Sequence, residues 1–307
     1  MLAERIERIA VIGAGLMGHG IAQEFASAGY QVFLADVCED KLHQALKSIE
    51  GNLRMLVTFG VLSPDRVAAV LDNIVPSLTL REAAWNVDLV IESVFENLEL
   101  KQNLFRELDA VCPEHTILGT NSSAIMPSQL AEATRRPEKV LGIHFFNPPY
   151  LVPLVEVVTT ERTPEAIVDT AIAVLRKLGK KPAVLRKEVP GFLANRLQAA
   201  LLREAISLVA KGVAAPENVD YAIKYGLSRR WAVAGVFELF DLAGWDTVLA
   251  AASYILPDLE SSNDTSLLRA KVERGELGVK SGRGFYDWTP EQAAALKKRI
   301  AEALVRG

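Results

Sequence analysis

The sequence predicts an α/β protein, in which a doubly wound, mostly parallel sheet forms the N-terminal domain and a smaller C-terminal domain is all-α. Three observations support this prediction. The first half of the 307-residue chain alternates short apolar runs with segments of helical spacing, which is typical of parallel sheets covered by helices. A glycine-rich segment joins the first apolar run to the first helical one. After Pro190-Gly191, apolar residues recur mainly at helical spacing.

The apolar runs of the first half are short and continuous, as buried parallel strands are. The predicted strands are 8–12, 31–35, 88–92, 116–119, 139–145 and 153–158, with one more near 181–186. The predicted helices between them are roughly 16–28, 39–57, 98–111 and 163–178.

The second half begins with a helical pattern over 192–212, for which Gly212 is a plausible C-cap. The last helix starts cleanly, with Thr289 as N-cap and Pro290 in the first helical position. We therefore expect two domains, 1–188 and 189–307.

Composition excludes several classes of protein. Half of the residues are hydrophobic and 23% are charged, which indicates a globular chain and not a disordered one. The net charge of −4 is spread without a basic stripe, so we expect no nucleic-acid partner. Cys38 and Cys112 lack metal or redox spacing, so we expect no metal site and a reducing compartment. The apolar run at 9–23 is too short to span a bilayer, and acidic residues at the N-terminus argue against a signal peptide. We expect a cytoplasmic protein without a membrane partner.

Residues 13–18 read GAGLMG between a predicted strand and a predicted helix. In such a turn Gly13 permits the tight bend, Gly15 lets backbone approach a pyrophosphate, and Gly18 allows helix and strand to pack closely. The helix N-terminus then offers free N–H groups to phosphates. The expected cofactor contacts in this turn are Gly13, Gly15, Leu16, Met17 and Gly18.

Asp36 ends the next predicted strand, 18 residues after Gly18. A carboxylate there accepts hydrogen bonds from ribose hydroxyls and repels a 2′-phosphate, so the pattern favours NAD over NADP in a Rossmann-type domain. The alternative is a glycine-rich turn packed for its own sake, with Asp36 capping the following helix.

His144 closes an apolar run, and Glu156 lies within the next one. A carboxylate inside an apolar run needs a partner, because burying an unpaired charge is costly. Two antiparallel segments joined through NPPY would place Glu156 beside His144, and such a pair suits a general base. The alternative is a hydrogen-bonded core histidine with Glu156 facing water.

Two further polar positions stand out. Asn121-Ser122-Ser123 follows a predicted strand, where open α/β sheets bind ligands, although a turn before the next helix is equally compatible. Asn195 lies in an apolar helical stretch, past the expected cap positions, and needs a hydrogen-bond partner. A helix–helix contact would also supply one.

Taken together, the motifs resemble those of the L-3-hydroxyacyl-CoA dehydrogenase family over nearly the whole chain. The motifs are VIGAGLMGHGIA at 11–22, ENLELK at 96–101, GIHFFNPP at 142–149, LVEVV at 154–158, PGFLANR at 190–196 and KSGRGFYDW at 280–288.

The resemblance implies an NAD-dependent dehydrogenase with His144 as general base, oriented by Glu156. It implies that Ser123 and Asn195 bind the substrate oxygens of a short-chain acyl-CoA. Further cofactor contacts are expected at Glu96, Lys101, Asn121 and Lys280. It also implies a homodimer formed through the helical domain.

The sequence departs from the acyl-CoA pattern after Asp36. The family's CoA-binding serine and lysine correspond to Asn52 and Phe59, and whether Arg54 replaces the missing cation is open.

Other segments resemble the gulonate and carnitine dehydrogenases, which take free 3-hydroxy acids. These are MPSQL at 126–130, NPPYLVPLVE at 147–156 and KEVPGFLANRLQ at 187–198. Arg229 and Arg230 could clamp a free carboxylate, or they are a solvated pair after a helix end. FELFDLAGWD at 237–246 resembles the acyl-CoA branch instead. A third class is a non-catalytic, crystallin-like NAD-binding protein, which the presence of all four expected catalytic residues disfavours.

Overall fold

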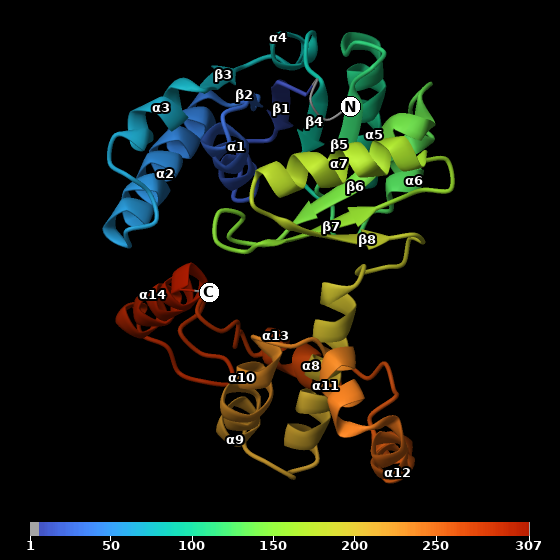
Figure 1. Cartoon of the computed structure of the whole chain (residues 1–307). Helices are drawn as coiled ribbons and strands as arrows, with labels where there is room; N and C mark the ends of the chain where they lie inside the picture. Colours follow the sequence, from blue (N-terminus) through green and yellow to red (C-terminus); the bar gives the residue numbers. More distant parts are fainter. Residues whose placement is uncertain (1–5, 307) are drawn as a thin grey trace. The chain divides into compact units, whose positions relative to one another are not determined.

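The structure is a computed structural model that describes residues 6–306 (Figure 1). Its contacts group the chain into two compact units. One contains the described residues up to Ala194 together with the end of the chain from Arg299, and the other is Asn195–Lys298. Each unit is described here by itself.

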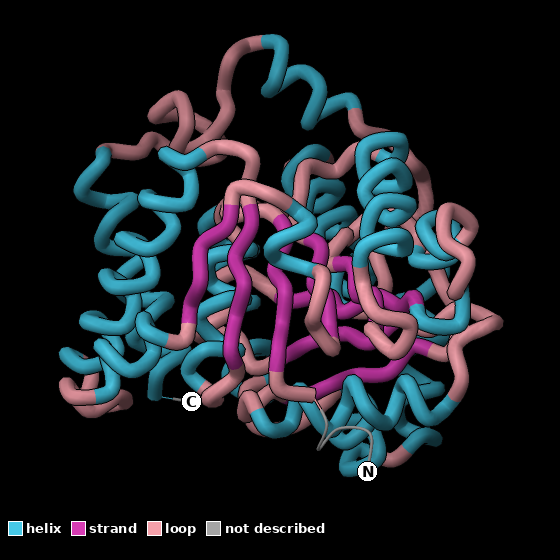
Figure 2. Tube along the Cα trace, turned by 90° about the horizontal axis from the view of Figure 1, so that it is seen from above, coloured by secondary structure: helices cyan, strands magenta, loops and turns pink. Residues whose placement is uncertain are grey.

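The first unit is built on one eight-stranded sheet, with the strand order β3-β2-β1-β4-β5-β6-β7-β8. Strands β1 to β6 are paired in parallel, β7 is antiparallel to β6, and β8 is parallel to β7. Figure 2 shows the strands running between layers of helix. The strands are β1 Arg8–Ile12, β2 Gln31–Ala35, β3 Ile74–Ser77, β4 Leu89–Glu92, β5 Ile117–Thr120, β6 Val140–Phe145, β7 Leu154–Val158 and β8 Lys181–Leu185.

Helices cover both faces of this sheet because its strands are apolar on both sides. Along β1, Ile9 and Val11 belong to one core cluster, whereas Ala10 and Ile12 belong to another. The first cluster is shared with α1 Gly18–Ser27, α2 Glu39–Thr58, α3 Arg66–Asp72 and α7 Glu165–Lys177. The second is shared with α4 Leu80–Ala84, α5 Leu98–Val111 and α6 Pro127–Ala131, which a 3₁₀ turn at Pro137–Lys139 follows. The predicted doubly wound α/β domain is confirmed.

The second unit is helical, as the sequence predicts. Its helices are α8 Ala194–Ala210, α9 Pro216–Tyr221, a π-helical turn Ala222–Leu227, α10 Ser228–Trp231, α11 Val236–Ala243, α12 Trp245–Ile255, a 3₁₀ turn Leu256–Asp258 and α13 Ser266–Glu273. The last helix, α14 Pro290–Arg306, begins in this unit, and its residues from Arg299 belong to the first unit. The expected caps are present, since Gly212 has φ +68° and the Thr289 hydroxyl accepts the N–H of Gln292 at 3.2 Å.

No single helix among the described residues is long and apolar enough to cross a bilayer. One pair of helices, α11 with α12 and the turn after it, has the necessary length and composition together, but the pair is bent by 108°.

Two local differences from the predicted elements have physical causes. Strand β3 was not predicted, because Pro76 interrupts its four residues, but β3 is an edge strand, where proline is tolerated. The helix predicted from 192 begins at Ala194, because Gly191 and Phe192 have φ +78° and +51°, which no helix accommodates. Asn195 is therefore the second residue of α8, closer to the start of the helix than the sequence predicts.

The strand order reverses at β1, which has β2 on one side and β4 on the other. Open α/β sheets bind ligands at such a switch point, at the carboxyl ends of the strands. The segments that follow β1, β2, β4 and β5 therefore define the candidate site.

Candidate active site

The three glycines after β1 differ in the space that a side chain would find at each position. Gly13 has φ +102°, and a Cβ there would lie 2.5 Å from the Ser93 carbonyl oxygen. A Cβ on Gly18 would lie 1.7 Å from the carbonyl oxygen of Gly13, so α1 and the turn pack without space for a methyl group. A Cβ on Gly15 would meet nothing within 4 Å. Gly13 and Gly18 thus form the bend, and Gly15 leaves open space in front of it.

Backbone donors face that open space. The N–H groups of Gly15, Leu16 and Met17 have no hydrogen-bond partner among residues 6–306, and α1 begins directly after them. Unpaired N–H groups at a helix N-terminus are a ready site for phosphate oxygens.

Asp36 lies beside the turn, after β2. Its carboxylate accepts the N–H of Ala14 at 3.0 Å with one oxygen and the N–H of Cys38 at 3.2 Å with the other. Asp36 therefore fixes the glycine turn and also the residue before α2. A carboxylate has about four acceptor positions, so both oxygens can still accept ribose hydroxyls.

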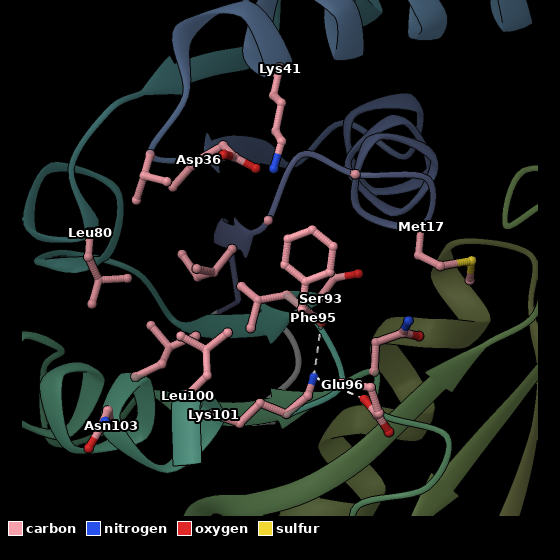
Figure 3. A pocket seen from close by; sticks show the side chains of 18 of the residues that line it. Met17, Asp36, Lys41, Leu80, Ser93, Phe95, Glu96, Leu100, Lys101 and Asn103 are labelled. Carbon is pink, nitrogen blue, oxygen red and sulfur yellow. Dashed lines mark hydrogen bonds and ion pairs between the residues drawn. The ribbon is translucent and has the colours of Figure 1, made fainter. Parts of the chain in front are cut away.

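A cavity of about 810 Å³ extends from this turn across the carboxyl ends of β1, β2 and β4 (Figure 3). Apolar side chains line much of it, among them Ile12, Val37, Leu78, Leu80, Val94 and Leu104. Asp36, Asn121 and Ser123 also line it. A long apolar cavity with phosphate donors and a ribose acceptor fits a dinucleotide.

A buried ion pair lies beneath this cavity. The Lys101 ammonium is 2.5 Å from a Glu92 carboxylate oxygen, and their side chains are 1% and 0% exposed. Glu92 also accepts the hydroxyl of Thr120 and the N–H of Val94, each at 2.7 Å. Lys101 lines the cavity, but its ammonium pairs with the carboxylates of Glu92, at the end of β4, and of Glu96, in the segment after it. An acidic residue ending an apolar run at 88–92 was the sequence signal for Glu92.

Glu96 extends this network to the loop after β5. It lies 3.4 Å from Lys101 and accepts the Ser122 hydroxyl and the N–H groups of Ala124 and Ile125. Burial raises the pKa of Glu96, but these hydrogen bonds and the Lys101 charge outweigh it, so its pKa lies below the ordinary value. Glu96 thus stays ionised and fixes the loop that presents Ser123.

Asn121 joins this loop to β6. Its side-chain oxygen accepts the N–H of Phe145 at 2.8 Å, next to His144. The remaining amide donors of Asn121, on the edge of the cavity, are available to a ligand. The serine-turn alternative holds for Ser122, which is buried and accepts the N–H of Ile125 at 2.9 Å, but Ser123 is exposed.

His144 and Glu156 are directly opposite residues of the antiparallel pair β6 and β7, as the sequence predicts. The distance from His144 Nδ1 to a Glu156 oxygen is 2.8 Å, and both residues are buried. Because an ionised carboxylate can only accept, Nδ1 carries a proton, and in the neutral imidazole Nε2 is then the nitrogen with the lone pair. The rings of Phe146 and Phe192 contact the imidazole edge to face, at 4.7 and 5.5 Å between centroids.

The other oxygen of Glu156 has partners that the sequence did not reveal. It accepts the N–H groups of Leu193 and Ala194 at 2.9 and 2.8 Å. The left-handed conformation of Gly191 and Phe192 turns the chain so that these two donors face the carboxylate. Burial raises the pKa of Glu156, but the bonds from His144, Ala194 and Leu193 outweigh burial and hold its pKa below the ordinary 4.5.

Replacing Glu156 by Gln is expected to lower the free energy of unfolding at pH 7 by about 2–3 kcal/mol, because an amide cannot accept so many charged hydrogen bonds. The folded-state pKa is depressed, so the Glu156 contribution is present above pH 4.5 and is lost as pH falls through the folded value. In urea denaturation the gap between wild type and E156Q should therefore shrink below pH 4.5. A gap that is constant from pH 7 downwards would contradict an ionised Glu156.

Asn195 and Lys280 belong to the second unit. Asn195 is half-buried in the first turn of α8, and Lys280 is exposed in the segment between α13 and α14. The predicted roles of both residues stay predictions.

Comparison with known families decides the relationship. The model of the 3-hydroxyacyl-CoA dehydrogenase NAD-binding domain matches residues 8–189, and that of the C-terminal domain of the same enzymes matches 191–288. The chain belongs to the 3-hydroxyacyl-CoA dehydrogenase family. The predicted family and the NAD cofactor are confirmed, and the chain is an NAD-dependent oxidoreductase of this family.

Individual relatives differ in their substrates. The chain is 35% identical over 301 residues to the 5-formyl-3-hydroxy-2-methylpyridine 4-carboxylate 5-dehydrogenase of Mesorhizobium japonicum, covering 98% of this chain and 96% of that one. It is 39% identical to a probable 3-hydroxybutyryl-CoA dehydrogenase of Bacillus subtilis, over 92% of this chain and 98% of the relative.

The similar solved structures also include a pyridine-carboxylate dehydrogenase and a 3-hydroxybutyryl-CoA dehydrogenase. A crystal structure of the pyridine-carboxylate dehydrogenase, described as NAD+ dependent, has a TM-score of 0.91 at 34% identity, covering 98% of this chain and 97% of that one. The (S)-3-hydroxybutyryl-CoA dehydrogenase of Ralstonia eutropha has a TM-score of 0.78 at 30% identity, covering 92% and 99%. The family's fold and cofactor are shared, whereas the substrates of these relatives are not.

Proposed function

We propose that this protein oxidises the 3-hydroxyl group of a short-chain L-3-hydroxyacyl-CoA to the ketone, with NAD+ as hydride acceptor. The observation that supports this most directly is the His144–Glu156 pair, because Nδ1 donates to the carboxylate and Nε2 of the neutral imidazole is then the nitrogen that can accept a proton. When bound, the nicotinamide supplies the hydride acceptor, and the protein supplies orientation and proton transfer.

His144 takes the hydroxyl proton at Nε2 as the carbon–hydrogen bond is broken. Glu156 stabilises the imidazolium that forms, because hydrogen bonds from two backbone N–H groups and from His144 keep the Glu156 carboxylate ionised. Ser123 and Asn195 hydrogen-bond the substrate oxygens. In the reverse direction the imidazolium returns the proton to the oxygen.

Cofactor contacts are proposed at the glycine turn (Gly13, Gly15, Leu16, Met17 and Gly18), at Asp36 and Asn121, and at Glu96, Lys101 and Lys280. For Lys101, which is buried in ion pairs, the contact comes from the stem that lines the cavity. Domain limits of 1–188 and 189–307 are part of the same proposal.

A free carboxylate is the second candidate substrate. Asn52, where the family binds CoA through serine, donates to Gln23 at 3.0 Å, and Phe59 carries no charge. Arg54 pairs with Glu50 at the surface, where ion pairs are weak. The relative that matches 98% of this chain is named as a dehydrogenase of a small pyridine carboxylate.

The experiment compares kcat/KM for NAD+ reduction with 3-hydroxybutyryl-CoA, free 3-hydroxybutyrate, gulonate, carnitine and the pyridine carboxylate. We expect kcat/KM for the thioester to exceed that for every free acid by at least about 10-fold, the worth of one hydrogen bond to the CoA group that free acids lack. A free acid that equals or exceeds the thioester would replace the first candidate by the second. NADH binding without turnover of any of these would instead support a crystallin-like role.

We further propose that the protein is a homodimer formed through its helical unit. Large apolar side chains are exposed along α11 and α12, including Phe237, Leu242, Leu249 and Tyr254. Large apolar side chains exposed on two consecutive helices suit an association face.

A further inference from the structure

The charges that line the cofactor cavity are unevenly engaged. The cations of the lining are Lys41 and Lys101, and its carboxylates are those of Asp36, Glu96 and Glu107. The Lys101 ammonium is already paired with the carboxylates of Glu92 and Glu96. The Lys41 ammonium forms no ion pair or hydrogen bond in the part of the chain that the structure describes, and it contacts only the ring of Phe95. The diphosphate of a dinucleotide is a dianion, so Lys41 is the lining cation that remains for it.

The position of Lys41 suits an ion pair with the diphosphate. It lies in the first turn of α2, five residues after Asp36, and its side chain points into the cavity (Figure 3). Its ammonium lies 5.1 Å from the ring centroid of Phe95, which follows β4 and is 74% exposed. A cation over an aromatic face at an exposed site is held only weakly, so the ammonium can move to a stronger anionic partner.

The phosphate donors of the glycine turn line the same cavity. Gly15, Leu16 and Met17 contribute free N–H groups, and Asp36 is tied to this turn through Ala14. Phosphate oxygens bound at these N–H groups would lie on the side of the cavity where Asp36 is. Lys41 extends into the cavity from the same side. A lysine side chain has a flexible four-carbon stem and a point charge that suits such an oxygen.

We propose that Lys41 is a cofactor-binding residue that pairs with the diphosphate of NAD, and that Lys41 and Phe95 together form a strap over the bound dinucleotide. The strap adds a charge contact to the backbone donors, and it connects the start of α2 to the segment after β4. This contact involves the cofactor alone and does not depend on which substrate the enzyme takes.

The test is a binding titration of Lys41→Met, which keeps most of the stem and removes the charge, against Lys47→Met as a matched control. Lys47 is exposed on the same helix and does not line the cavity. For NADH and ADP in low salt, K41M is expected to raise Kd by about 10-fold, the worth of one charge-assisted contact. Adenosine should bind to K41M as to wild type, and K47M should match wild type throughout. The K41M defect should shrink in high salt, because an exposed charge contact is screened.

Three outcomes would overturn the proposal. Wild-type Kd values of K41M for NADH and ADP would mean that Lys41 contacts no phosphate. An equal loss for adenosine would assign Lys41 to packing around the base. In a further titration with 2′-AMP, a loss of affinity confined to that ligand would mean that Lys41 contacts the 2′ position of the ribose and not the diphosphate. Because no turnover is measured, each result is independent of the proposed reaction, whose failure would appear only in the substrate assay.

Discussion

Replacing His144 by Gln is expected to lower kcat by about 10³-fold, within the range ascribed to a general base, while the Kd for NADH stays within about 2-fold of wild type. Glutamine keeps a polar group near Glu156 but cannot take a proton from the substrate hydroxyl. Steady-state kinetics on the best substrate and NADH fluorescence titration measure the two quantities separately.

His115→Gln is the matched control for this substitution. His115 is exposed and pairs with Asp88, on the side of the sheet where β4 begins, so its loss should leave kcat unchanged. If H144Q kept wild-type turnover, His144 would be a core histidine. If H144Q lost NADH binding together with stability, the residue would have a structural role.

Replacing Gly15 by Val is expected to raise the Kd for NADH by at least about 100-fold without lowering the melting temperature. A Cβ at this position would meet nothing within 4 Å in the free protein, so folding should tolerate a small side chain. The same side chain would fill the space in front of the N–H groups that receive the phosphates. Calorimetric titration and thermal unfolding measure the two effects.

Gly18→Ala is the contrasting variant. Its Cβ would lie 1.7 Å from the Gly13 carbonyl oxygen, so this smaller change should destabilise the fold itself. A G15V protein that binds NADH normally would show that the phosphates do not lie against this turn. A G18A protein as stable as wild type would contradict the close packing of α1 on the turn.

Local sequence patterns were sufficient for much of the fold and for the cofactor. Residues 8–12 and 31–35 are strands as predicted, because buried parallel strands are short apolar runs with few alternatives. The pairing of His144 with Glu156 was also predictable, since a carboxylate in an apolar run requires a buried partner.

Other features depended on tertiary contacts that no local pattern encodes. Strand β3 forms only because β2 offers it a pairing edge. The bonds from Leu193 and Ala194 to Glu156 depend on the left-handed backbone of Phe192, and phenylalanine gives no signal for that conformation. Lys101 was expected to contact the cofactor, but its partner Glu92 lies nine residues away at the end of β4, and the pair is revealed only where α5 lies against that strand end.

The most direct test of the central claim uses a substrate deuterated at the carbon that bears the hydroxyl group, incubated with unlabelled NAD+. Hydride transfer to the nicotinamide predicts one deuterium in each molecule of reduced cofactor, detected by mass spectrometry, and a slower reaction than with unlabelled substrate. Reduced cofactor without deuterium, or deuterium released to water, would contradict direct hydride transfer at this site.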